Sequence, residues 1–292
     1  MSRIYDALKK LEAERARRAG SRAATEPGNG QGGGQGNGGG HGSGNGKRYG
    51  QGRGKPRGWR WLFPGNGEPD GVRVGPNFEL VPEAEEAYQR LGTNLLVGPG
   101  NEAVTTPRLL GLTASRHGEG TTTTAAVFAS VLVRRRGGRV AVVEANFRSP
   151  SFDAVFGIRR DGGLADLIQG RKPVAEVAQQ TEIPNLFAIG CGQSTLGPPA
   201  LFDSPGVVPV LGQLRAQFDF VIFDLPPATV YGDASILGPR LDAALIVIEA
   251  DRARIPEVER MRRSLDRVGV KLVGSILNRR RTYIPAFLEE ML

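Results

Sequence analysis

The sequence predicts an α/β fold in which helices cover both faces of a doubly wound, mostly parallel β-sheet. Short, nearly continuous apolar runs alternate with helical segments, which is typical of strands buried on both faces. Polar residues directly follow several of these runs, at the edge where such sheets hold ligands. The runs lie at residues 109–112, 139–144, 185–189, 218–224, 241–249 and 271–277.

A glycine-bearing loop, Ser115–Gly120, follows the first run and precedes a predicted helix at residues 121–135. Strand, glycine loop and helix form the context of a phosphate-binding loop, whose usual pattern is G-x-x-x-x-G-K-[ST]. Backbone N–H groups around Gly118 and Gly120, together with the helix N-terminus, would hold phosphate oxygens. Thr122 occupies the position of the metal-binding hydroxyl, but Thr121 stands where the pattern has its lysine.

Three further polar residues stand at strand ends: Glu144, Asp224 and Asn278. In a parallel sheet these ends lie at one edge, so we expect them to meet the glycine loop there. The two carboxylates are candidates for binding Mg²⁺ or orienting water.

The remaining elements are predicted to be helical. A helix at 83–96 precedes the first strand, two short helices within 163–180 are separated by Gly170 and Pro173, and further helices span 205–217 and 255–268.

The first 75 residues have a different composition from the rest. Residues 1–18 predict a short helix with an apolar stripe, suited to docking on a partner. Residues 19–75 are rich in glycine and predict a disordered linker, with one apolar island around Trp59 and Trp61. We therefore expect three parts: a docking helix at 1–18, the linker at 19–75 and a folded domain at 76–292.

Charge and cysteine content limit the classes of function. Residues 1–75 hold 14 Lys/Arg against 6 Asp/Glu and so carry the net charge of +8. An anionic surface is therefore a candidate partner of this arm, whereas binding to sequence-specific nucleic acid is not favoured. The single cysteine, Cys191, excludes a disulfide framework. No apolar run approaches the length of a membrane span, so a cytoplasmic protein, peripheral at the membrane only through a partner, is expected.

Several motifs resemble those of the bacterial tyrosine autokinases of capsule and exopolysaccharide synthesis, which belong to the MinD/ParA-like P-loop group. GEGTTTTAA is similar to the family form GEGKTTTA, EANFRSPS to DADLRRPS, and FDFVIFDLPPATVYGDA to FDYVIIDTPPVLxxxDA. The opening MSRIYDALKKLE and the ending SILNRRRTYIP also resemble family sequences. The resemblance runs from about residue 83 to the end.

The resemblance implies an ATP- or ADP-binding site with Mg²⁺, in which Thr122, Glu144 and Asp224 ligate the metal. Glu144 and Asp224 would be the catalytic carboxylates, and Arg116 is a candidate replacement cation. The implied cofactor-binding residues are Gly118, Glu119, Gly120, Thr121, Thr122, Thr123, Arg148 and Asn278, the last of them at the adenine.

The chain departs from the family at the positions that phosphoryl transfer needs. Thr121 replaces the lysine, Glu144 is one methylene longer than the family's aspartate, and Asn146 lacks a charge. The family's oligomerising E-x-x-R-x-x-R segment keeps Glu86, but Gln89 and Gly92 replace both ring-forming arginines. The C-terminal region offers only Tyr283 in place of a tyrosine cluster.

The predicted function is a degenerate member: a regulatory pseudo-kinase of capsule or exopolysaccharide biosynthesis or export, in which nucleotide and Mg²⁺ binding is weak or absent. Its partner would be a membrane polysaccharide copolymerase or a related kinase, reached through the N-terminal helix; a homo-oligomer would form without the ring arginines. The alternatives are an active, divergent tyrosine kinase or ATPase and a MinD/ParA-type positioning ATPase.

Overall fold

The computed structural model describes residues 80–97 and 107–280. The predicted docking helix at 1–18 and linker at 19–75 lie outside the described residues, as does Tyr283. The described residues therefore cover most of the predicted folded domain.

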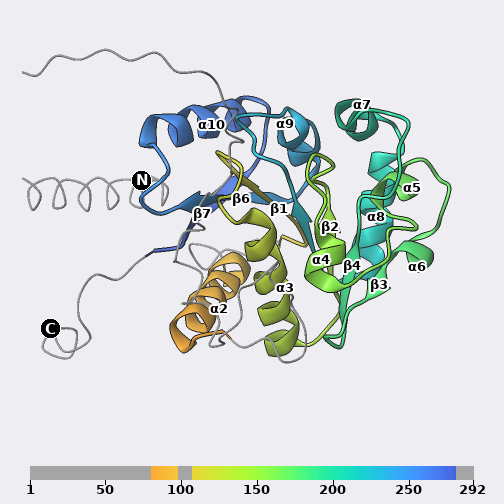
Figure 1. Cartoon of the computed structure of the whole chain (residues 1–292), viewed down its shortest axis with the longest axis horizontal. Helices are drawn as coiled ribbons and strands as arrows, with labels where there is room; N and C mark the ends of the chain where they lie inside the picture. Colours follow the sequence, from red (N-terminus) through yellow and green to blue (C-terminus); the bar gives the residue numbers. More distant parts are fainter. Residues whose placement is uncertain (1–79, 98–106, 281–292) are drawn as a thin grey trace, which may run out of the picture.

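A seven-stranded sheet forms the centre of the domain, with the strand order β3-β4-β2-β5-β1-β6-β7 (Figure 1). Among the described strands, only β3 runs antiparallel, against β4, and the other neighbouring pairs are parallel. The predicted doubly wound, mostly parallel sheet is confirmed. The strands are β1 (Leu109–Ala114), β2 (Val140–Glu144), β3 (Gln179–Gln180), β4 (Leu186–Ile189), β5 (Phe220–Asp224), β6 (Ala243–Glu249) and β7 (Leu272–Asn278).

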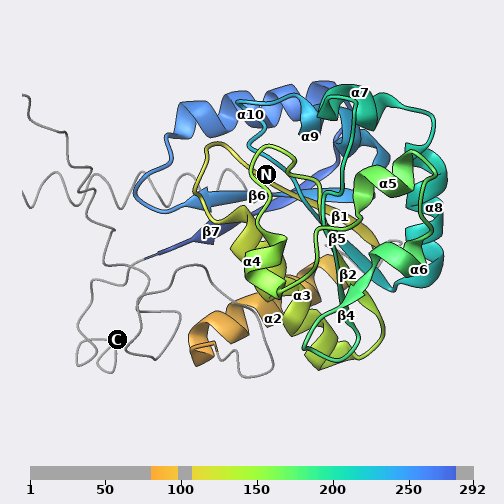
Figure 2. The same cartoon turned by 45° about the vertical axis from the view of Figure 1, so that its right-hand side comes forward.

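Helices cover both faces of this sheet (Figures 1 and 2). One face packs against α2 (Pro82–Val97), α3 (Thr121–Arg136) and α4 (Phe152–Phe156). The opposite face packs against α5 (Leu164–Ile168), α6 (Val174–Val177), α7 (Pro198–Asp203), α8 (Val207–Gln217), α9 (Asp233–Leu237) and α10 (Ile255–Arg267). A short 3₁₀ helix, η2 (Gly238–Arg240), follows α9.

The central strands send successive side chains into opposite layers. Leu109 belongs to the core beneath α8, and Leu110 to the core beneath α3. Because both faces are buried, an unbroken apolar run rather than an alternating pattern encodes these strands. At the sheet edge, β7 is only half-buried, and its Val273 is exposed.

Several strands begin one or two residues later than the sequence predicts. Aspartate side chains accept backbone N–H groups where two of the strands start. Asp219 accepts the N–H of Arg139 at 2.8 Å, and Asp242 accepts the N–H groups of Arg108 and Leu109 at 2.8 and 2.9 Å. Five of the described elements were not predicted: α4, α7, α9, η2 and β3.

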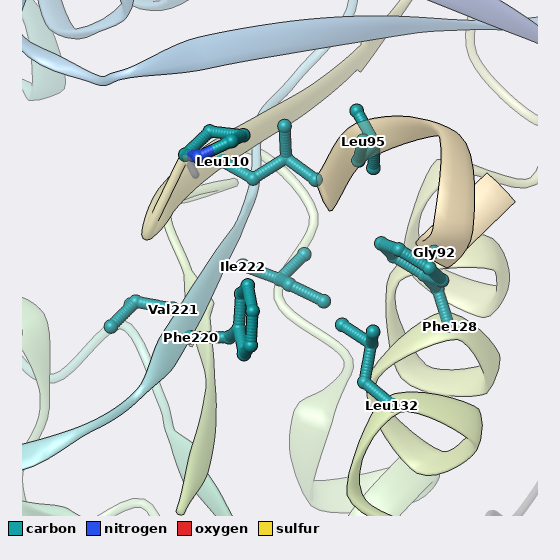
Figure 3. A pocket seen from close by; sticks show the side chains of 9 residues that line it. Gly92, Leu95, Leu110, Phe128, Leu132, Phe220, Val221 and Ile222 are labelled. Carbon is teal, nitrogen blue, oxygen red and sulfur yellow. The ribbon is translucent and has the colours of Figure 1, made fainter. Parts of the chain in front are cut away.

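A small apolar pocket lies between α2, α3 and the amino ends of β1 and β5 (Figure 3). Gly92 faces Leu132 of α3, and a Cβ on Gly92 would lie 3.4 Å from Cδ2 of Leu132, which is ordinary van der Waals contact. The lining is wholly apolar and sits at the end of the sheet opposite the glycine loop, so it belongs to the packing of α2. The lining residues are Gly92, Leu95, Pro107, Leu110, Phe128, Leu132, Phe220, Val221 and Ile222.

Within residues 80–97 and 107–280, no helix combines the length and the apolar character that crossing a membrane requires.

Candidate functional site

The glycine loop lies between the end of β1 and the start of α3, as the sequence predicts. Gly118 and Gly120 have φ values of 82° and 91°, which favour glycine. A Cβ on Gly120 would lie 2.2 Å from Nδ2 of Asn278, so glycine is required there for space as well. Gly120 caps α3 without a side-chain acceptor, and the first turn of that helix carries no acidic residue. Its N-terminal N–H groups, which have no intrahelical acceptor, therefore suit an anion.

Glu119 holds the loop closed from the inside. Its carboxylate is fully buried and accepts the N–H groups of Ser115 and Arg116 at 2.7 and 2.9 Å, and the Ser115 hydroxyl at 3.0 Å. The side chain of this predicted cofactor-binding residue is thus committed to the loop itself.

Thr122 and Asp224 come together at the carboxyl ends of the strands. The Thr122 hydroxyl donates a 2.6 Å hydrogen bond to Oδ2 of Asp224. The pKa of the Asp224 carboxyl is raised to about 7, chiefly by burial; the Thr122 hydrogen bond lowers it and the nearby charge of Glu144 raises it. Oδ1 of Asp224 is buried and has no hydrogen-bond partner within the described residues.

These two residues fit a magnesium ion. Mg²⁺ prefers oxygen ligands and is commonly held by one or two carboxylates together with substrate phosphates and water. The unpartnered Oδ1 of Asp224 and the Thr122 hydroxyl supply such ligands. In the described part of the chain, no group of three or more His, Cys, Asp or Glu side chains is placed to hold a metal.

Glu144 is a register neighbour of Asp224 on β2, but its carboxylate is used elsewhere. It accepts the N–H groups of Ser151, of Phe152 at 2.8 Å and of Cys191 at 3.2 Å. Ser151 and Phe152 begin α4, so Glu144 acts as an N-terminal acceptor for that helix. Burial, followed by the Glu144 charge, raises the pKa of the Cys191 thiol. The predicted metal-ligand role of Glu144 would require it to leave three backbone donors.

Arg116 points toward α10, where its guanidinium forms an ion pair with Glu257. The proposed replacement cation is therefore bound to a carboxylate in this structure.

Arg148 is connected to the glycine loop through the Tyr231 ring. Its Nε is 3.4 Å from Oδ2 of the fully buried Asp233, and its guanidinium stacks 4.7 Å from the centre of the Tyr231 ring. The Tyr231 ring in turn makes an edge contact with His117 of the loop at 5.5 Å. Buried oxygen atoms without a partner in the described chain also occur here, on Asp233 and Asn146.

Asn278 supports the loop from the end of β7. Its amide Nδ2 donates to the carbonyl of Glu119 at 2.8 Å, and its Oδ1 accepts the N–H of Arg279 at 2.9 Å. The predicted adenine contact is thus occupied by contacts within the protein. Arg279 donates to the carbonyl of Gly118 at 2.8 Å.

Sequence reasoning missed Glu249, Arg252 and Arg279 beside the loop. Glu249 ends β6 just as Asp224 ends β5, so the same strand-end rule would have found it. Thr121 and Thr123, in the first turn of α3, are half-buried.

The chain resembles known kinases in sequence. It is 28% identical over 202 residues to the tyrosine-protein kinase CpsD of Streptococcus pneumoniae serotype 4. The matched residues cover 69% of this chain and 86% of that protein. It is 29% identical over 140 residues to the tyrosine-protein kinase ptk of Acinetobacter johnsonii, but spans only 19% of that longer protein. Its homologues are bacterial tyrosine-protein kinases. No family model matches the chain.

Solved structures agree with the fold. The kinase domain of VpsO has a TM-score of 0.59 at 24% identity, covering 68% of this chain and 97% of that one. The kinase domain of the Escherichia coli tyrosine kinase ETK has a TM-score of 0.58 at 23% identity, covering 62% and 71%. The fold is that of the MinD/ParA-like P-loop proteins, as predicted.

Proposed function

We propose that this chain is a cytoplasmic, kinase-like regulator of capsule or exopolysaccharide biosynthesis or export in which phosphoryl transfer is lost or weak. The observation that carries the proposal is the absence of a lysine at Thr121, combined with the pairing of Arg116 with Glu257. A threonine hydroxyl cannot supply the positive charge that this position gives to the terminal phosphates.

The energetic cost of losing such a contact is large. Removing one preorganised electrostatic contact costs about 3–4 kcal/mol of transition-state stabilisation, which is about two to three decades in rate. The engagement of Glu144 with the start of α4 further supports weak transfer, because it leaves Asp224 as the carboxylate facing Thr122.

The protein's own groups still support a binding role. Bound Mg²⁺ would neutralise phosphate charge; Thr122 and Asp224 would hold it, and the first turn of α3 would orient the phosphates. Asn278 and Glu119 keep the loop in shape for this purpose.

The decisive experiment incubates the purified full chain with Mg·ATP and measures phosphotyrosine. We expect none above the level of an Asp224→Ala variant. Phosphotyrosine that forms in the wild type and disappears in Asp224→Ala would establish the alternative, an active divergent kinase. In that case Arg116→Ala tests whether Arg116 leaves Glu257 to supply the cation.

The proposed partner is a membrane polysaccharide copolymerase or a related kinase, bound through the helix at 1–18, with the linker at 19–75 giving reach and the domain at 76–292 acting as the effector. Co-purification with the copolymerase of the same organism should be lost when residues 1–18 are deleted. Retained co-purification would assign the contact to the folded domain.

A further inference from the structure

Arg252 lies against the glycine loop. A Cβ placed on Gly118 would be 3.5 Å from Nη1 of Arg252, which brings the guanidinium to the exposed side of this loop residue. Arg252 lies in the turn after β6, in which Asp251 adopts a φ of 66° and the carbonyl of Glu249 accepts the N–H of Ala253 at 3.2 Å. A non-glycine residue with positive φ is uncommon, and such residues concentrate at functional sites.

Arg252 shares its carboxylate partner with a second arginine. Nη1 of Arg252 is 2.9 Å from Oε2 of Glu249, and Nη1 of Arg279 is 3.0 Å from Oε1. Two guanidinium groups therefore meet one carboxylate beside the loop.

The two arginines differ in exposure. The side chain of Arg252 is 52% exposed, whereas those of Arg279 and Glu249 are 25% and 15% exposed. Arg279 is also fixed by the carbonyl of Gly118. If Arg252 turned toward an anion in the loop, Glu249 would keep Arg279 as its partner, and no buried charge would be left alone. Because the guanidinium of Arg252 is half-exposed and the more buried Glu249 keeps Arg279, the cost of leaving this ion pair is small.

The other arginines near the loop are less suited to this movement. Arg148 holds Asp233, whose side chain is fully buried, and its departure would withdraw a cation from a buried carboxylate. Arg116 holds Glu257 on α10.

We infer that Arg252 is the cation that binds the phosphate groups of a nucleotide in this loop, in place of the lysine that Thr121 replaces. A guanidinium pairs with phosphate oxygens through two parallel hydrogen bonds, which suits a polyphosphate. The inference rests on the proposed function in one respect, since it takes the loop to be a nucleotide site.

The test is calorimetric titration of the full chain with ADP, with adenosine and with inorganic tripolyphosphate, each with Mg²⁺. We expect Arg252→Gln to weaken the binding of ADP and tripolyphosphate about ten-fold, the size of one charge-assisted contact, and to leave adenosine unchanged. Arg252→Lys, which keeps the charge, should lose less. Arg262→Gln is the matched control, because Arg262 is also ion-paired, with Glu259 and Asp266 on α10.

A second variant tests the shared carboxylate. Glu249→Gln removes the charge that competes with phosphate, so tripolyphosphate should bind more tightly to it than to the wild type. The gain should vanish when Arg252→Gln is added.

Unchanged ADP and tripolyphosphate binding in Arg252→Gln would overturn the inference. So would a loss confined to adenosine, which would make Arg252 a contact of the base. A wild-type chain that binds neither ADP nor tripolyphosphate also overturns it, but leaves the proposed function standing, because that function is refuted only by phosphotyrosine formation.

Discussion

The hydroxyl of Thr122 donates its hydrogen bond to the carboxylate of Asp224, and these two side chains link the first turn of α3 to the end of β5. Asp224 is nearly fully buried, and its pKa is raised from 3.8 to about 7. The pair therefore changes its charge near neutral pH, which has consequences for metal binding and for stability.

Magnesium binding should strengthen as the pH rises through about 7, because a metal ligand must be deprotonated and Asp224 ionises there. Titration with Mn²⁺ at pH 6 and pH 8, followed by electron paramagnetic resonance, measures this. Asp224→Asn should abolish the dependence. An affinity that is equal at both pH values in the wild type would refute the prediction.

The same pKa predicts a stability change of definite sign. Between pH 3.8 and about 7 the folded state keeps a proton on Asp224 that the unfolded state has lost, so the contribution of Asp224 to the free energy of unfolding falls as the pH rises through this window. Urea unfolding at intervals from pH 4.5 to 7.5 should show a steeper fall in the wild type than in Asp224→Asn. Parallel curves would contradict the raised pKa.

Restoring the missing charge should increase nucleotide affinity. Thr121→Lys should tighten ATP binding by about ten-fold or more, the size of one charge-assisted contact. Thr121→Gln, which adds length without charge, is the matched control. Phosphoryl transfer should stay slow in Thr121→Lys and become faster in the double variant Thr121→Lys, Glu144→Asp. An equal rate in the single and the double variant would argue against a role for Glu144.

Removing the side chain of Glu144 should destabilise the fold. Glu144→Ala leaves the N–H groups of Ser151, Phe152 and Cys191 without their acceptor, at a cost of about 3 kcal/mol in the free energy of unfolding. Glu144→Gln keeps an acceptor oxygen and should cost about 1 kcal/mol. Glu182→Ala, at an exposed position, is the control for urea unfolding. A neutral Glu144→Ala would show that these contacts do not hold α4.

Gly120→Ala should destabilise the protein more than Gly269→Ala. Both glycines have positive φ, 91° and 85°, but a Cβ on Gly120 meets Asn278 whereas a Cβ on Gly269 has no described atom within 4 Å. Strain from φ alone costs about 1 kcal/mol at each position, and the clash adds to it at Gly120. Adding Asn278→Ala should recover part of the loss in thermal unfolding. Equal melting temperatures for the two glycine variants would contradict the close approach.

The sequence predicted those parts of the site that follow from backbone topology. Apolar runs located every described strand except β3, and the strand-end rule placed Glu144, Asp224 and Asn278 at one edge with the glycine loop. The sequence could not predict which groups the side chains of these residues would contact. Glu144 turns to α4, a five-residue helix without an amphipathic pattern long enough to recognise. Arg252 lies beside the loop in a turn where Asp251 adopts positive φ, which no pattern in the sequence indicates.

Helix α3 joins two distant parts of the domain. Its first turn carries Thr122 at the glycine loop, while Phe128 stacks on Tyr88 of α2 with ring centres 6.4 Å apart. Phe128 lies six residues after Thr122, which is a rise of about 9 Å along the helix axis. Because a helix moves as a rigid rod, any tilt that a ligand imposes on the first turn would be transmitted to α2 on the outer surface.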